Sequence, residues 1–129
     1  MNTKLNPESV RAPGGAYSHT VKVPKNAEWL LISGQIGVDA KGKVGDGIRK
    51  QADQTFNNIL ACLKENGMSK KDLVKFTVYL TDPRFIADYR ASRKRFIGDS
   101  IVPTSTLLII DGLAAPELLI EIEAWAAKA

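Results

Sequence analysis

Hydrophobic and polar positions recur along the chain with two clear periods. In 47–63, apolar residues return every three or four positions, which predicts an amphipathic helix. The inner face of this helix would carry Ile48, Ala52, Phe56, Ile59, Leu60 and Leu63. Gly67 follows closely and predicts the C-terminal end of the helix. In 73–80, apolar residues occupy alternate positions, which is typical of a strand.

A second helix is predicted to begin at Asp82 and Pro83. The Asp82 side chain can accept hydrogen bonds from free amides of a first turn, and Pro83 suits the first helical position, where no N–H is needed. Gly98 predicts the end of this helix. Its inner face would carry Phe85, Tyr89 and Phe96.

Four further segments have the composition of strands, namely 20–23, 29–32, 104–110 and 118–126. The turn at Pro24-Lys25-Asn26 predicts that the first two of them pair as a β-hairpin. The first sixteen residues are expected to form an extended arm.

The predicted order is therefore β-β-α-β-α-β-β, within one α+β domain spanning residues 1–129. Strands joined through helices need crossovers, so the sheet would be mixed, with both helices on one face. The other face would stay uncovered and would carry Tyr79, Leu107 or Leu108, and Trp125. An apolar sheet face on a chain of this size is usually buried by another subunit, so we expect a homo-oligomer.

Composition excludes several classes of protein. The chain is 44% hydrophobic and 25% charged, which is ordinary for a globular domain. It has no apolar run long enough for a membrane span and no apolar core for a secretory signal near its start, so a cytoplasmic protein is expected. The net charge of +4 is mild. The densest basic cluster comprises Arg90, Arg93, Lys94 and Arg95, which suits a solvated helix face better than an RNA-binding patch.

Candidate chemistry is sparse. His19 and Cys62 are the only histidine and cysteine, so neither a metal site nor an internal disulfide is expected, and no cofactor motif is present. Two features stand out. A glycine turn presents the hydroxyl of Tyr17, and alternation places Glu121 and Glu123 on the same face of an otherwise apolar strand. Such a carboxylate could face water on a half-exposed strand, or it could orient a water molecule or move a proton in a cleft.

Together these segments resemble the RidA (YjgF, endoribonuclease L-PSP) family. The similarity spans nearly the whole chain. It lies in Pro13–Ser18, Ile32–Ile36, Gln51–Leu63 with Asn58 and Ile59, Val74–Leu80, Pro103 and Ile120–Ala124.

The resemblance implies a chorismate-mutase-like fold, in which three chains form a central barrel with small-molecule clefts between neighbouring subunits. In deaminase members, water attacks a 2-imino or 2-enamino acid there, releasing ammonia and a 2-keto acid without a cofactor or metal. Tyr17 would offer its hydroxyl to the ligand, and Ser33 with Gly34 would line the cleft. Glu121 would position or activate the water, helped by the backbone of Leu107.

Three positions depart from the family pattern. Ser105 stands where deaminase members have an arginine that grips the substrate carboxylate, and a serine cannot form that two-pronged ion pair. Losing such a clamp commonly costs on the order of 3–5 kcal/mol. Tyr89 replaces the usual asparagine and would reshape the cleft, and His19 replaces a common glutamine. The ligand could thus be a neutral or cationic imine or a different small molecule, unless His19 or a basic side chain such as Arg90 supplies the missing positive charge.

Three hypotheses follow. The chain could be an imine or enamine deaminase with altered substrate preference, as Tyr17 and Glu121 suggest. It could be a trimeric protein that binds a small metabolite without catalysis, as Ser105 and Tyr89 suggest. It could act on RNA, as the endoribonuclease label of the family suggests, although no base-stacking motif or histidine pair supports this.

Overall fold

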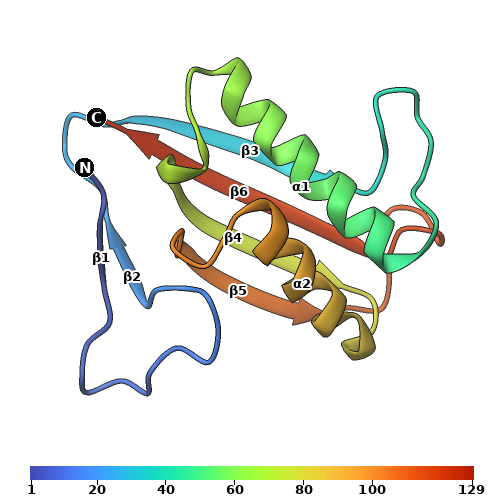
Figure 1. Ribbon diagram of the computed structural model, residues 1–129, viewed down its shortest axis with the longest axis horizontal. Coiled ribbons are helices and arrows are strands. Elements are labelled where there is room, and N and C mark those ends of the chain that lie inside the picture. Colours follow the sequence, from blue (N-terminus) through green and yellow to red (C-terminus); the bar gives the residue numbers. More distant parts are fainter.

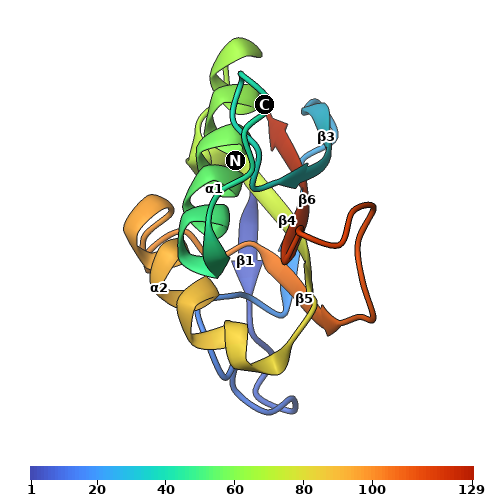
Figure 2. The same ribbon diagram turned by 90° about the vertical axis from the view of Figure 1, so that its right-hand side faces the viewer.

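Two helices lie side by side on one face of a four-stranded sheet (Figures 1 and 2). The computed structural model describes residues 1–129. The main strands are β3 (Glu28–Ile36), β4 (Leu73–Leu80), β5 (Thr104–Ile109) and β6 (Ile120–Lys128). The helices are α1 (Gly47–Glu65) and α2 (Ile86–Phe96), with 3₁₀ turns η1 (Lys70–Asp72) and η2 (Pro83–Phe85). Two short strands, β1 (Thr3–Leu5) and β2 (Thr20–Lys22), form a separate sheet.

The main sheet is mixed, as predicted. Its strand order is β3-β6-β4-β5. β4 and β5 run parallel because α2 crosses over between them, whereas β6 is antiparallel to both β3 and β4. Both helices cover the same face, so the predicted α+β architecture is confirmed.

The core lies between the helices and the sheet. Phe56 of α1 is fully buried, with ring centroids of Phe76, Tyr89 and Phe96 at 6.1, 6.0 and 6.4 Å. Burying an aromatic side chain of this size stabilises a fold by about 1.5–3 kcal/mol. This cluster joins both helices to β4, and it confirms the inner faces expected from the periodicity.

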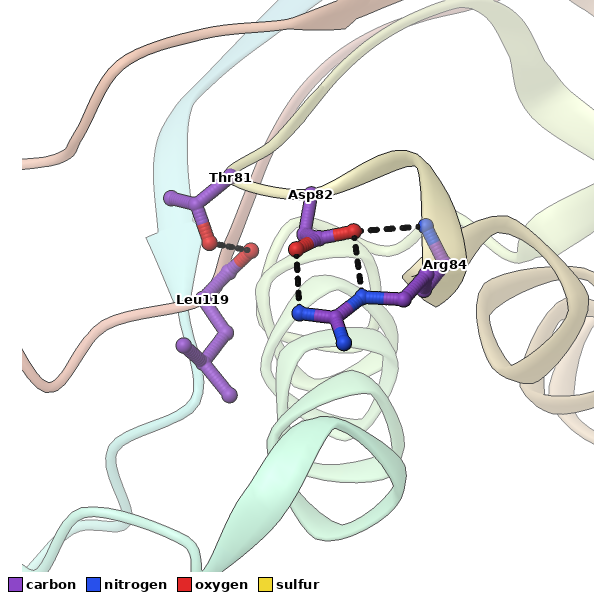
Figure 3. A network of polar contacts seen from close by, with 4 residues as sticks. All are labelled: Thr81, Asp82, Arg84 and Leu119. Atoms are coloured by element: carbon purple, nitrogen blue, oxygen red, sulfur yellow. Dashed lines mark hydrogen bonds and ion pairs between the residues drawn. The ribbon is translucent and has the colours of Figure 1, made fainter.

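Local signals end the helices as the sequence predicts. Gly67 and Gly98 follow α1 and α2 with φ of 68° and 85°, values that favour glycine. Asp82 accepts a 2.8 Å hydrogen bond from the backbone N–H of Arg84 and pairs with its guanidinium at 2.7 Å (Figure 3). These contacts hold the pKa of Asp82 below its usual range. The hydroxyl of neighbouring Thr81 donates to the carbonyl of Leu119 at 3.5 Å.

The predicted hairpin between 20–23 and 29–32 is wrong. β2 pairs instead with β1, in a segment expected to be an extended arm, and β3 pairs with β6. The β3–β6 pairing buries Ile32 beside Ala124, a gain that a hairpin at the edge would not provide. β3 also continues through Ser33 and Gly34, where the sequence predicted that the strand had ended.

The second face of the main sheet is open (Figure 2). Trp29 and Leu31 of β3 are 51% and 61% exposed, and Leu108 and Trp125 are also exposed. Trp29 and Trp125 contact edge to face at 5.9 Å, and the Lys75 ammonium lies 5.5 Å from the Trp125 ring centroid. The sequence left open whether Leu107 or Leu108 lies on this face, and the structure places Leu108 there.

Candidate functional site

A pocket of about 240 Å³ opens between the loop before β2, helix α2 and strand β5. We call it the tyrosine pocket. It is lined by Gly15, Ala16, Tyr17, Tyr89, Arg90, Arg93, Ser105 and Leu107. Four of the predicted site residues therefore meet here, namely Tyr17, Tyr89, Ser105 and Leu107, together with Arg90, which the sequence suggested as a source of positive charge.

Tyr17 is held by its own loop. Its hydroxyl accepts a 3.3 Å hydrogen bond from the backbone N–H of Gly14. The ring of His19 contacts the Tyr17 ring edge-on at 5.8 Å, and His19 Nε2 lies 2.6 Å from the carbonyl oxygen of Arg11. His19 thus supports Tyr17 from behind and does not line the pocket. The backbone N–H of Ser18 donates to Pro103 at 3.1 Å, which fastens the loop beside β5.

Tyr89 reaches the pocket from the core. Its ring stacks on Phe56, and only 4% of the residue is exposed. Burial raises the pKa of Tyr89, against the opposing effects of the Arg93 charge, a hydrogen bond with Ser105 and the Arg90 charge. The hydroxyl is therefore protonated at neutral pH and faces Ser105, so a tyrosine and a serine close this part of the pocket.

The two arginines of the pocket have different surroundings. Arg93 is buried, and its guanidinium donates to the carbonyls of Gly98 at 3.1 Å and Ile101 at 2.6 Å. Burial also lowers the pKa of Arg93. These bonds shape the loop that leads into β5. Arg90 is exposed and makes no hydrogen bond or ion pair with another protein group. No carboxylate lines the pocket.

A second pocket, of about 270 Å³, lies on the open face of the sheet. We call it the acidic pocket. It is lined by Gly34, Tyr79, Ile110, Leu113, Glu121 and Glu123. The Tyr79 hydroxyl donates to Glu123 Oε1 at 3.3 Å. Desolvation raises the pKa of Tyr79, and the nearby charges of Glu123 and Glu121 reinforce this effect. The pocket therefore gathers two carboxylates beside a neutral phenol.

Gly34 lies directly against Glu121. The β3–β6 register shifts between Ile32 and Gln35, which marks a β-bulge. A Cβ added to Gly34 would overlap the Glu121 carboxylate, so only glycine leaves this carboxylate its position. Ser33 lies beside Gly34 but is exposed and lines neither pocket.

Two amides of α1 hold the strands of the acidic pocket. Gln51 is 2% exposed; its Nε2 donates to Gly45 and Glu117 at 3.1 and 2.8 Å, and its Oε1 accepts from the Leu119 amide at 2.9 Å. These bonds fix the start of β6, two residues before Glu121.

Asn58 plays the corresponding part for β3. Its Nδ2 donates to the carbonyls of Ile36 and Val38, each at 3.1 Å. In the sequence, Gln51 and Asn58 stood out only as parts of a segment that resembles the family. Two amide side chains beside the apolar face of the first helix were the only sign in the sequence that these residues bind backbone groups.

The strand register places the two pockets on opposite sides of the sheet. Ser105 lies beside Phe76 and points to the helix side, whereas Glu121 lies beside Tyr79 and points to the open side. One chain thus separates the predicted site residues into two groups. Tyr17, Tyr89, Ser105 and Leu107 form one group, and Gly34 and Glu121 form the other.

The structure shows neither a cluster of metal ligands nor a membrane-spanning helix. No three His, Cys, Asp or Glu side chains come close enough to hold a metal ion. Cys62 is half-buried and unpaired. No helix combines the length and apolarity that crossing a membrane requires.

Comparison with known proteins gives the same family as the motifs. Residues 8–128 of the chain match the Endoribonuclease L-PSP family. The chain belongs to this family, which includes the RidA/YjgF proteins. A RutC family protein of Pyrococcus horikoshii is 36% identical over 130 residues, covering 99% of both chains.

Two further relatives bear on fold and activity. A crystal structure of a Yersinia pestis protein of unknown function, from the conserved Rid family, superposes with a TM-score of 0.88 at 28% identity, covering 98% of both chains. The 2-iminobutanoate/2-iminopropanoate deaminase of Salmonella typhimurium is 28% identical over 130 residues, covering 99% of both chains.

Proposed function

We propose that the chain is a hydrolytic deaminase of reactive imines or enamines, with an active site that forms between copies of the chain. The tyrosine pocket of one copy would face the acidic pocket of its neighbour in a homotrimer. The observation that carries this proposal is the separation of Tyr17 and Glu121 into open pockets on different sides of the sheet. A site that needs both residues has to be completed by a second copy.

The uncovered sheet face supports this assembly. It presents Trp29, Leu31, Leu108 and Trp125 to solvent, and the acidic pocket opens on the same face. Burying these side chains against other copies would remove apolar surface from water, at roughly 25 cal/mol per Å². The barrel of three sheets implied by the family resemblance would bury this face in its interior.

The chemistry needs no cofactor. Glu121 would accept a proton from a water molecule as the water oxygen forms a bond to the imine carbon, and the C=N electron pair moves to nitrogen. Glu121 would then return the proton to that nitrogen. The intermediate now carries a hydroxyl and an amino group on the same carbon. Glu121 would pass the hydroxyl proton to the amine nitrogen as the C–N bond breaks and the C=O bond forms, so that one imine and one water give one carbonyl compound and one ammonia. The Tyr17 hydroxyl would orient the ligand during these steps.

The name of the Salmonella relative supports this class of reaction. The altered substrate preference expected from Ser105 also remains part of the proposal, because the Tyr89–Ser105 contact occupies the part of the pocket where an arginine would otherwise act. The same contact favours the second candidate, a trimer that binds a small metabolite without turning it over.

The basic residues of α2 give little support to an RNA-acting protein. Arg93 is buried, Arg95 pairs with Asp53 at 2.6 Å, and Lys94 lies 3.7 Å from Asp99. The cluster is therefore largely engaged within the chain.

Ammonia release from freshly generated 2-iminobutanoate tests the proposal. The unaltered protein should accelerate hydrolysis, and Glu121→Gln should lower the rate by about a hundredfold or more, the usual contribution of a general base. Glu65→Gln, which changes an exposed carboxylate at the end of α1, should have no effect. A protein that binds the product but releases no ammonia would support the metabolite-binding candidate instead.

A further inference from the structure

Arg90 is the only cationic group of the tyrosine pocket that is not engaged by other protein groups. We propose that Arg90, on the helix side of the pocket, binds the carboxylate of the ligand in place of the arginine that deaminase members have at the position of Ser105, so that the 2-imino acids and 2-keto acids expected from the family resemblance still bind. The 2-imino acid part of this inference rests on the proposed deaminase function, whereas the carboxylate contact does not.

The surroundings of the two arginines carry the argument. The Arg93 guanidinium is committed to the carbonyls of Gly98 and Ile101. Arg90 lines the same pocket without a hydrogen-bonding or ionic partner in the chain. A guanidinium with free N–H groups matches the two oxygens of a carboxylate.

The charge of the pocket favours an anion. Its ionisable lining residues are Tyr17, Tyr89, Arg90 and Arg93, and none of them is acidic. The Tyr89 hydroxyl already experiences the positive charge of both arginines. On the side of the site that this pocket forms, a cationic group of the ligand would meet two like charges and a carboxylate would be attracted, whereas the carboxylates of Glu121 and Glu123 would lie on the opposite side, in the neighbouring copy.

The position of the Arg90 guanidinium also explains how the pocket could bind a carboxylate although Ser105 carries no charge. The Tyr89 side chain and Ser105 occupy the β5 side of the pocket, where neither offers a charge. Arg90 follows Tyr89 directly on α2 and offers its guanidinium from the helix side. The carboxylate would therefore be held by the helix, with the Tyr17 and Tyr89 hydroxyls as neutral partners.

The pocket volume limits the ligand. About 240 Å³, the part of the site that one chain supplies, accommodates a molecule of a few heavy atoms. Small 2-keto acids meet this condition and are stable enough to be used as probes.

Equilibrium binding of 2-oxobutanoate and 2-butanone to the full chain tests the inference. The two differ by replacement of the carboxylate with a methyl group. Titration calorimetry should give a dissociation constant for 2-oxobutanoate at least about tenfold lower than that for 2-butanone. Arg90→Gln should weaken 2-oxobutanoate binding by about tenfold or more, and Arg90→Lys by less.

Lys94→Gln is the matched control, because it removes an exposed positive charge from the same helix outside the pocket. It should leave binding unchanged. Arg90 is exposed, so Arg90→Gln should also keep the unfolding temperature of the unaltered protein. Equal binding of the two probes, no binding of 2-oxobutanoate, or full binding by Arg90→Gln would each overturn the inference.

The deaminase proposal can fail separately. If 2-oxobutanoate binds through Arg90 but no ammonia is released from 2-iminobutanoate, the carboxylate contact stands and the reaction does not. If the protein deaminates 2-iminobutanoate equally well with Arg90→Gln, the reaction stands and the role of Arg90 is wrong.

Discussion

Ser105 and Glu121 lie on opposite faces of one sheet, on strands separated by β4. Ser105 belongs to a pocket rich in hydroxyls and arginines, and Glu121 to a pocket with two carboxylates. Within one chain the backbone of the sheet keeps these groups apart. A site that uses both Ser105 and Glu121 therefore needs a second copy of the chain, whose acidic pocket would face the tyrosine pocket of the first.

Gly34→Ala should impair the acidic pocket while leaving the fold intact. The new methyl group would overlap the Glu121 carboxylate, so this side chain has to move away from its present position. We expect imine hydrolysis to fall by about tenfold or more, since small displacements of a catalytic group are costly. Gly112→Ala is a matched control, because nothing lies within 4 Å of the added atom. Equal hydrolysis rates for the two variants would contradict the account of Glu121.

Gln51→Ala should destabilise the protein by about 3 kcal/mol, because it removes three hydrogen bonds to part-buried backbone groups, each of which contributes about 1 kcal/mol. The three groups concerned are the carbonyls of Gly45 and Glu117 and the amide of Leu119. Denaturant unfolding measures the loss, and Asn57→Ala, at an exposed position of α1, should cost little. A Gln51→Ala variant as stable as Asn57→Ala would show that these bonds do not hold β6.

The sequence predicted the helices and the sheet class well, because their signals are local. The apolar spacing of α1 and the Asp82-Pro83 start of η2 need only a few neighbouring residues. The β1–β2 pairing and the bulge at Ser33 and Gly34 could not be predicted in the same way. They depend on contacts between distant segments, which short strands do not encode.

The candidate site, too, could be predicted only as far as its features depend on local sequence. Alternation correctly placed Glu121 and Glu123 on one face, and Tyr17, which the motif singled out, lines a pocket. Three contacts of the site depend on the tertiary structure and not on local sequence. His19 packs against Tyr17, Arg93 donates to backbone carbonyls, and Tyr89 stacks on Phe56. Chain order alone does not indicate which arginine keeps a free guanidinium.

Tyr89→Phe should make stability less sensitive to alkaline pH. Burial raises the pKa of Tyr89, so the folded state favours the protonated phenol. Its contribution to stability is complete below the ordinary tyrosine pKa of about 10 and is lost as pH rises towards the raised value. The free energy of unfolding, measured at neutral pH and at about pH 10.5, should fall less in Tyr89→Phe than in the unaltered protein. An identical fall in both proteins would contradict the burial of this hydroxyl.

Trp125→Glu should dissociate the proposed trimer. The side chain lies on the open sheet face against Trp29, and a carboxylate there would be costly to bury between copies. Light scattering should report a trimer for the unaltered protein, a trimer for Trp125→Phe, and smaller species for Trp125→Glu. A monomer of the unaltered protein at micromolar concentration would contradict the assembly.

Complementation between two inactive variants tests the central claim most directly. Tyr17→Phe damages the tyrosine pocket and Glu121→Gln damages the acidic pocket, so each variant alone should hydrolyse 2-iminobutanoate poorly. If the site forms between copies, equal co-expression should restore activity, because about one interface in four of a randomly mixed ring has both intact halves. Recovery of about a quarter of the unaltered activity is the predicted result. No recovery in trimers shown to contain both variants would contradict a site shared between neighbouring copies.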